Sequence, residues 1–256
     1  MVRINQFLAR CNLGSRRQVE DLIRNGKVLV NGSICKELST IIDTSNDVVK
    51  CNGKIVSMPA DFMYIMLNKP LDYVVTKSDE YGRKTVFDLL PPFAKSLNPV
   101  GRLDKDSEGL LILTNDGELA NQMMHPRFKL EKVYKVEVQG SLGREVLESL
   151  RQGVEIEGTK TQTARVFVKS HHGDQTTLRI TIREGKKRQI RRMLEAVGCR
   201  VLHLKRLQIG DVTLEKLPVG MWRHLTSHEV TALKRKTQLQ DAKPVRTKFK
   251  EQAGES

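Results

Sequence analysis

The sequence predicts an α+β protein built around a mixed sheet. Apolar residues alternate with polar ones at 134–138 and 178–182, and Val166 and Val168 follow the same two-residue spacing, which predicts half-buried strands. Apolar residues at i, i+3, i+4 and i+7 predict amphipathic helices over 4–11 and 190–197. Strands and helices intermix without a strict β-α-β repeat, which argues against a doubly wound parallel sheet. A chain of 256 residues has room for a small domain and a medium one.

The charge indicates a polyanionic partner. Lys and Arg number 44 against 30 Asp and Glu, a formal net charge of +14, and such an excess in a globular protein is typical of nucleic-acid binding. The alternative is that the charge serves only solubility. The excess is concentrated in residues 183–206, which hold nine basic and two acidic side chains. We therefore expect a nucleic acid to bind at this segment.

Other features of composition exclude several classes of protein. No apolar run approaches the roughly 20 residues that cross a bilayer, and the N-terminus lacks the basic-then-apolar layout of a signal peptide. The four cysteines are scattered, without the paired spacing of a zinc or redox motif. We expect a cytoplasmic monomer with free thiols, no metal and no cofactor.

Residues 1–60 are expected to form a helical hairpin followed by two β-hairpins. After the first helix, Ser15 stands three residues before Gln18, a capping-box spacing that starts a second helix. Gly26 suits the end of that helix. Asn31-Gly32 and Asn52-Gly53 each lie between apolar runs, which is a strong hairpin signal.

Residues 57–60 are a plausible linker because Pro59 and small residues interrupt the pattern. A second domain is then expected over 61–233. The same criteria predict its remaining elements: strands at 64–67, 74–76, 110–113, 201–204 and 212–214, and helices at 85–90, 118–124 and 142–150. Low hydrophobicity, Pro244 and mixed charge predict a basic, disordered tail over 234–256.

The segment GRLDKDSEGLLILTNDG at 101–117 is an acidic segment in a basic chain. Asp104, Asp106 and Glu108 precede a buried strand, and glycines at 101, 109 and 117 suit tight bends. A pair of these carboxylates could act in glycosidic chemistry, but neighbouring loop acids are more often simply solvated. The residues alone leave both readings open. The six histidines show no pattern with a nucleophile, and no phosphate-binding glycine-rich loop is present.

Two resemblances narrow these alternatives. FLARCNLGSRRQVEDLIRNGKVLVNG, within the first sixty residues, resembles the S4-type RNA-binding domain. GRLDKDSEGLLILTNDG, KVYKV at 132–136 and REGKKRQIRRMLEAVG at 183–198 resemble, in order and spacing, the pseudouridine synthases of the RsuA/RluB/RluE/RluF branch. One departure is Asp72, which stands in Lys69-Pro70-Leu71-Asp72 where the family commonly has Gly; it puts the geometry of this turn in doubt.

The resemblance implies a mixed, largely antiparallel sheet flanked by helices, and an enzyme that isomerises uridine in ribosomal RNA without a cofactor. It implies that Asp104 is the nucleophile and Tyr134 the active-site tyrosine. Arg191 matches the family's arginine, and its helical phase puts it at the edge of the core, where it could pair with Asp104 and keep it ionised. A phosphate contact is the alternative for Arg191. Further RNA contacts are expected from Arg16, Arg17, Arg24, Lys27, Lys69, Arg102, Lys186, Lys187, Arg188 and Arg192.

The partner implied is ribosomal RNA or a pre-ribosomal particle. Within the branch, the basic tail and the 183–192 cluster favour a large-subunit target, as in the RluB group. A small-subunit enzyme and a non-catalytic ribosome-assembly factor are the alternatives. The joint presence of Asp104, Tyr134 and Arg191 argues against a pure binding protein.

Overall fold

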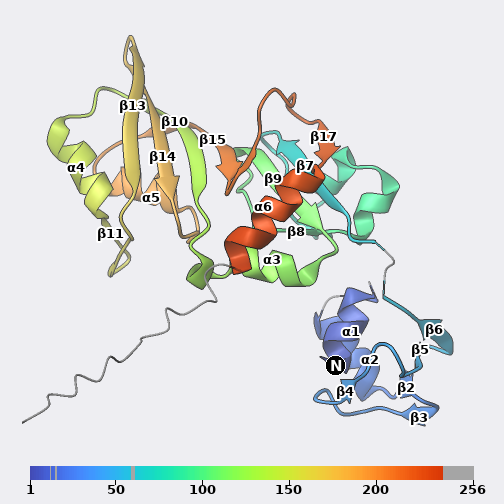
Figure 1. The fold of residues 1–256 in the computed structure, drawn as a ribbon. Helices are drawn as coiled ribbons and strands as arrows, with labels where there is room; N and C mark the ends of the chain where they lie inside the picture. The colour runs from blue at the N-terminus through green and yellow to red at the C-terminus, as the bar shows by residue number, and fades with distance from the viewer. Residues whose placement is uncertain (12, 15, 59–60, 239–256) are drawn as a thin grey trace, which may run out of the picture.

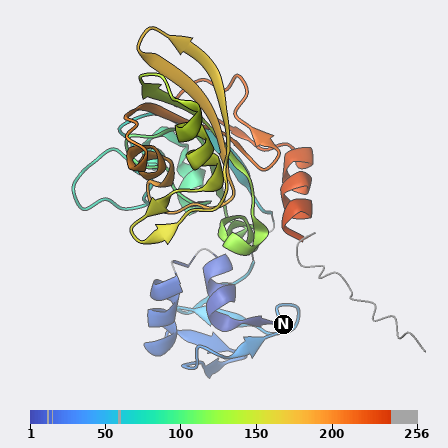
Figure 2. The same ribbon diagram turned by 90° about the vertical axis from the view of Figure 1, so that its left-hand side faces the viewer.

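The computed structural model describes residues 1–11, 13–14, 16–58 and 61–238. It has the expected α+β architecture: a small N-terminal unit (blue in Figures 1 and 2) and a larger unit built on a mixed, largely antiparallel sheet. The predicted cap Ser15 and half of the predicted linker lie outside the described residues.

The N-terminal unit packs two helices on a small sheet. Ile4, Phe7 and Leu8 of α1 are buried with Val19 and Ile23 of α2 in a core of their own, as the helical spacing predicted. Both Asn-Gly turns form, with Asn31 and Asn52 at φ 50°, the left-handed conformation that a tight hairpin turn requires. The elements are β1 (Val2–Arg3), α1 (Ile4–Arg10), α2 (Arg16–Arg24), β2 (Val28–Val30), β3 (Ser33–Ile34), β4 (Ile41–Ile42), β5 (Val49–Cys51) and β6 (Lys54–Val56).

The large sheet has the strand order β13-β14-β10-β15-β9-β7-β17, with β8 paired to β9 and β16 to β15. Its pairs are antiparallel except β9 with β15, which is parallel. The strands are β7 (Tyr64–Lys69), β8 (Asn98–Pro99), β9 (Glu108–Thr114), β10 (Lys132–Gln139), β13 (Arg165–His172), β14 (Gln175–Ile182), β15 (Val201–Ile209), β16 (Val212–Thr213) and β17 (Trp222–His224). A separate hairpin joins β11 (Glu155–Ile156) to β12 (Thr159–Lys160).

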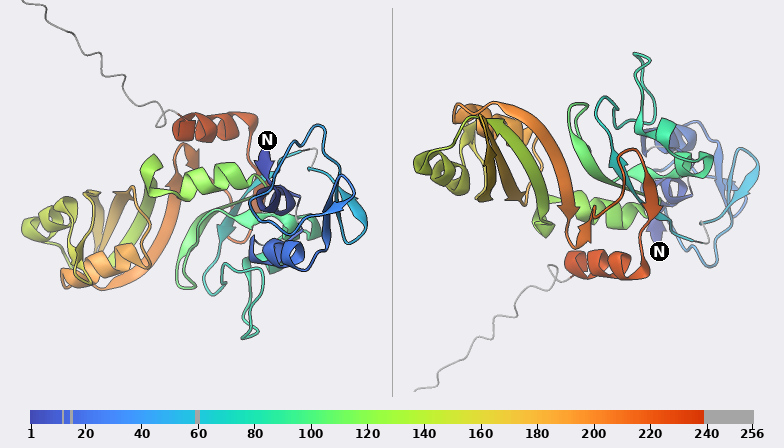
Figure 3. Two further views of the ribbon diagram at one scale, coloured as in Figure 1. Left: turned by 90° about the horizontal axis from the view of Figure 1, so that it is seen from below. Right: turned by 90° about the horizontal axis from the view of Figure 1, so that it is seen from above.

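Two helices pack on the half of the sheet around β14, and two others on the half around β9 (Figures 1 and 3). Leu150 of α4 and Met193 of α5 pack on β10, β13 and β14, whereas Leu119 of α3 and Leu233 of α6 pack with β7, β9 and β15. The α-helices are α3 (Gly117–Met124), α4 (Arg144–Gln152), α5 (Gln189–Ala196) and α6 (Ser227–Gln238), and the 3-10 helices are η1 (Val86–Leu89), η2 (Pro92–Ser96) and η3 (Pro126–Phe128).

Strand β9 lies inside the larger unit, with every residue buried. Leu110 and Ile112 contact the core of α3 and α6, while Leu111 and Leu113 face η1 and η2 on the other side. This two-sided burial explains why its sequence is continuously apolar rather than alternating. The loop just before β9 is therefore held by a rigid central strand.

The C-terminal helix differs from expectation. The predicted tail begins at Lys234, but α6 continues to Gln238, and Leu233 and Thr237 are fully buried. Burial against α3 and β15 stabilises a segment whose composition alone is polar. Residues 239–256 lie outside the described part. Within the described part, no helix is both long enough and apolar enough to cross a membrane.

Candidate active site

The cavity beside Asp104 has a volume of about 870 Å³ and is lined by the loop before β9, the end of α3, β10, β15 and the 183–189 loop. Asp104 and Tyr134, 30 residues apart in sequence, both line it. A smaller cavity of about 430 Å³ shares Arg102, Asp104 and Lys187 with the first. Asp104 therefore lies where the two cavities meet.

Asp104 is held by its backbone while its carboxylate stays available. Its carbonyl accepts a hydrogen bond from the Ser107 amide at 3.1 Å, closing the turn before β9. The side chain is half-buried and makes no hydrogen bond or ion pair with a described residue. Its charge acts electrostatically on Lys69 and Arg188. A carboxylate that faces a cavity and is not already paired can act on a bound substrate.

Tyr134 lies on β10 directly beside Arg206 of β15 in the strand register. Only 8% of the tyrosine is exposed, and it packs in the same cluster as Leu103. The hydroxyl makes no hydrogen bond within the described part of the chain. The residue is thus both a packed core side chain and part of the cavity wall.

The predicted pair between Arg191 and Asp104 is not formed. Arg191, 8% exposed as its helical phase predicted, places Nε 3.2 Å from Oδ2 of Asp106, and its Nη2 donates to the Asp106 carbonyl at 2.5 Å. Arg188 Nη2 lies 3.0 Å from the same carboxylate oxygen. Burial raises the pKa of Asp106, but Arg188 and Arg191 outweigh burial and lower it. Asp106, one of the acids of the 101–117 segment, therefore links α5 to the Asp104 loop.

Glu108 is also more than a loop residue, since it is the first residue of β9 and is 9% exposed. It lies 2.5 Å from Lys205 Nζ and 3.1 Å from His203 Nε2. These contacts fasten the start of β9 to β15.

The burial of Lys69 contradicts the predicted contact with RNA, because the residue is 0% exposed. Its Nζ donates to the carbonyls of Pro70 at 2.9 Å and Ser107 at 2.8 Å. Burial lowers the pKa of Lys69 to about 8, opposed by the surrounding carboxylates. Lys69 thus cross-links the end of β7 to the Asp104 loop.

The departure at Asp72 is accommodated without loss of the turn. Asp72 adopts φ 64°, the left-handed conformation that glycine enters freely and aspartate tolerates better than most residues. Its amide donates to the Lys105 carbonyl at 2.9 Å. This segment therefore still contacts the Asp104 loop.

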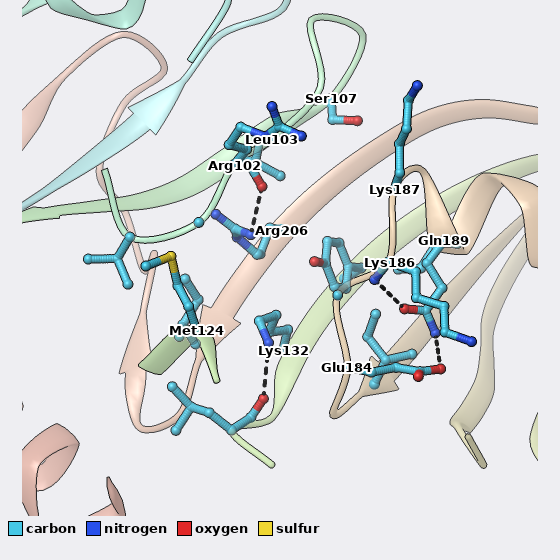
Figure 4. Close-up of a pocket in the computed structure, with 18 of the residues that line it drawn as sticks. Arg102, Leu103, Ser107, Met124, Lys132, Glu184, Lys186, Lys187, Gln189 and Arg206 are labelled. Atoms are coloured by element: carbon cyan, nitrogen blue, oxygen red, sulfur yellow. Dashed lines mark hydrogen bonds between the residues drawn. The ribbon is translucent and has the colours of Figure 1, made fainter. Parts of the chain in front are cut away.

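The other predicted RNA-contacting residues have different surroundings. Arg102, Lys186 and Lys187 are exposed and line the cavity (Figure 4). Arg192 is ion-paired with Glu157 at 2.8 Å. On α2 and just after it, Arg17, Arg24 and Lys27 are exposed, while the side chain of Arg16 lies outside the described part.

Two cationic residues of the cavity were missed by the sequence reasoning. Lys132 and Arg206 both line it (Figure 4), and neither pairs with a carboxylate of the described chain. Arg206 is 3% exposed and donates to the Leu110 and Arg102 carbonyls at 2.7 and 3.4 Å, yet its buried Nη2 has no hydrogen-bond partner. Burial and then Arg206 lower the pKa of Lys132 to about 8. The position of Lys132 two residues before Tyr134, on the same strand face, was the available signal.

Comparisons with known proteins agree with this geometry. The sequence matches the family described as RNA pseudouridylate synthase over residues 63–196 and the S4 domain over residues 2–49. An "Uncharacterized RNA pseudouridine synthase" of Aquifex aeolicus (strain VF5) is 42% identical over 234 residues, covering 91% of this chain and 93% of its own. "Ribosomal large subunit pseudouridine synthase B" of Bacillus subtilis (strain 168) is 39% identical over 236 residues, covering 91% and 96%.

A solved structure described as "Crystal structure of pseudouridylate synthase" superposes with a TM-score of 0.66 at 31% identity, covering 91% of this chain and 100% of its own. Sequence and fold thus agree along nearly the whole chain, and both resemblances read from the sequence are confirmed. The chain belongs to the RNA pseudouridylate synthase family, a family of isomerases, and carries an S4 domain at its N-terminal end.

Proposed function

We propose that this enzyme converts a specific uridine of large-subunit ribosomal RNA into pseudouridine, with Asp104 as the nucleophile. The observation that carries the proposal is the Asp104 carboxylate, which faces the same cavity as Tyr134 and is paired with no side chain of the described residues. The choice of RNA is supported by relatives named "Ribosomal large subunit pseudouridine synthase B" in Bacillus subtilis and Vibrio cholerae, 39% and 38% identical.

The proposed reaction breaks one bond and makes another on the same ribose carbon. The Asp104 carboxylate attacks C1′, or stabilises positive charge there, as the bond from C1′ to N1 of uracil breaks. The uracil turns so that its C5 faces C1′, and the new C1′–C5 bond forms. C5 then loses its proton and N1 gains one, so that atoms and electrons balance without a cofactor. In this proposal the Tyr134 ring stacks on uracil, and its hydroxyl assists removal of the C5 proton.

The target base has to leave its stack to reach Asp104. A cavity of about 870 Å³ is within the range of roughly 300–1,000 Å³ that encloses small molecules, far smaller than an RNA helix. We therefore include base flipping in the mechanism.

The basic residues divide into two groups in this proposal. The first group faces the cavity and contacts RNA phosphates or uracil oxygens; it consists of Arg102, Lys132, Lys186, Lys187 and Arg206. Arg188 and Arg191 instead hold Asp106, and through it the Asp104 loop, so we assign Arg191 a positioning role rather than direct contact with the nucleophile.

We also propose that the two units divide the work. Residues 1–60, whose helix α2 carries exposed Arg17 and Arg24, bind RNA near the target, and the larger unit performs the isomerisation. The separate hydrophobic cores of the two units support this division.

The test of the nucleophile is Asp104→Asn, which keeps the size of the side chain and removes its charge. Purified variants are incubated with large-subunit ribosomal RNA transcribed in vitro, and pseudouridine is mapped along the RNA. We expect Asp104→Asn to lose conversion while binding RNA about as tightly as the wild type. The matched control is Asp174→Asn, because Asp174 is exposed at the β13–β14 turn. Conversion by Asp104→Asn at the rate of the control would overturn the assignment.

A further inference from the structure

The loop between β7 and η1 projects beside the active site. Residues 76–85 lie in the teal segment that extends from the body of the larger unit (Figures 2 and 3). Its base is closed by the bridge between Val74 and Thr85. The loop lines the smaller cavity, which also contains Asp104.

One carboxylate holds the conformation of the loop through hydrogen bonds within it. Asp79, whose side chain is 5% exposed, accepts hydrogen bonds from the amides of Tyr81 at 3.2 Å and Arg83 at 2.7 Å. It also binds the Arg83 guanidinium through Nη2 at 2.6 Å and Nε at 3.0 Å. These bonds order the turn in advance, so that a ligand binding to it does not have to fix its conformation.

This braced turn holds an aromatic ring in solvent. Tyr81 is 79% exposed, and the Arg83 guanidinium carbon lies 4.9 Å from its ring centroid. The contact restricts the ring while leaving most of its surface open. The ring contributes to none of the hydrophobic clusters of the described chain, so its packing does not explain its presence.

The surroundings favour a nucleic-acid base as the partner. Tyr81 shares the smaller cavity with Arg102, Lys105 and Lys187, which can contact phosphates on either side of a stacked base. Flipping a uridine towards Asp104 leaves the neighbouring base without one of its stacking partners. We propose that Tyr81 stacks on an RNA base next to the flipped uridine and replaces part of that lost stacking. This inference rests on the proposed function and assigns a further contact to the same substrate.

The test compares Tyr81→Ala, Tyr81→Leu and Tyr81→Phe with the wild type, using large-subunit ribosomal RNA transcribed in vitro. Base–aromatic stacking is worth about 1–3 kcal/mol per base, so losing the ring should raise Kd and KM by about 5- to 150-fold. Tyr81→Ala and Tyr81→Leu should both show the rise while kcat at saturating RNA changes little. Tyr81→Phe keeps the ring and should stay close to the wild type. If Tyr81 made only an apolar contact without stacking, Tyr81→Leu would instead bind RNA about as tightly as the wild type.

The matched control is Phe167→Ala, because Phe167 is 53% exposed on β13 and lines neither cavity. All variants should melt at the wild-type temperature, since each side chain is exposed. Unchanged Kd and KM for Tyr81→Ala, or an equal rise for Phe167→Ala, would overturn the inference. Binding and conversion are measured separately. A wild type that binds this RNA but forms no pseudouridine would refute the proposed function, and the Kd values of the Tyr81 variants would still test the stacking inference. A wild type that does not bind the RNA would refute both.

Discussion

Lys132 provides a test in which stability and function are expected to change in opposite directions. Its side chain lies in the cavity with Arg206 nearby and without a carboxylate partner among the described residues. In Lys132→Met the length of the side chain is kept and the charge is removed. We expect this variant to be more stable than the wild type at pH 7 and to bind RNA more weakly.

The magnitude follows from the pKa of Lys132, which burial and the charge of Arg206 lower from 10.5 to about 8. At 1.36 kcal/mol for each tenfold change in proton affinity, the folded state holds the charged lysine at a cost of about 3 kcal/mol. Because the side chain is only partly buried, solvent screening reduces this cost, and we expect a net gain of ~1–3 kcal/mol for Lys132→Met.

The sign of the pH dependence follows from the same values. Below pH 8 lysine is protonated in both states, so the whole cost is present. Between pH 8 and 10.5 the folded state loses the proton while the unfolded state keeps it, so the cost disappears as pH rises. The advantage of Lys132→Met should therefore be largest at pH 7 and much smaller by pH 10.

Urea denaturation of both proteins at several pH values between 7 and 10 measures this difference, and the titrations common to both proteins cancel. Lys160→Met is the control, because Lys160 is exposed on β12, and it should show no such trend. A Lys132→Met variant that is less stable at pH 7, or whose difference from the wild type is constant with pH, would refute the reasoning.

Two further predictions concern Gly109 of β9 and the division of the chain into two units. Gly109 has φ 110°, and a Cβ there would lie 2.2 Å from the Arg206 carbonyl oxygen; Gly109→Ala should therefore lower stability by more than about 2 kcal/mol and reduce conversion. Gly117→Ala, where a Cβ meets nothing within 4 Å, is its control in thermal melting, and equal melting temperatures would contradict the prediction. Deletion of residues 1–60 should leave a folded enzyme with a raised KM and a similar kcat, because the two units have separate cores; failure of residues 61–256 to fold would contradict the two-unit proposal.

Much of the architecture could be read from local pattern. The stripe of Ile190, Met193 and Leu194 predicted α5 and left Arg191 at the edge of the core, where it lies. Asp116 caps α3 by accepting a hydrogen bond from the Leu119 amide at 3.0 Å, and the helix begins within a residue of the predicted 118–124. Local periodicity suffices in these cases because each element buries one continuous face.

Helix α6 shows where local pattern fails. Its sequence is polar and mixed in charge, and this low hydrophobicity led to the prediction of a disordered tail from residue 234 onward. A few residues, among them Leu233, pack into a core made by distant strands, and this burial is invisible in composition.

The sequence alone was enough to predict the fold class and the family, and to single out Asp104 and Tyr134 as candidate catalytic residues. These depend on the order and spacing of residues along the chain. The surroundings of the charged side chains became visible only in three dimensions: Arg191 binds Asp106 rather than Asp104, Lys69 is buried, and Arg206 lies beside Tyr134. Charge pairing and desolvation depend on distances of a few ångströms between segments that lie far apart in sequence, as for Arg191 and Asp106, which are 85 residues apart. No local pattern encodes those distances.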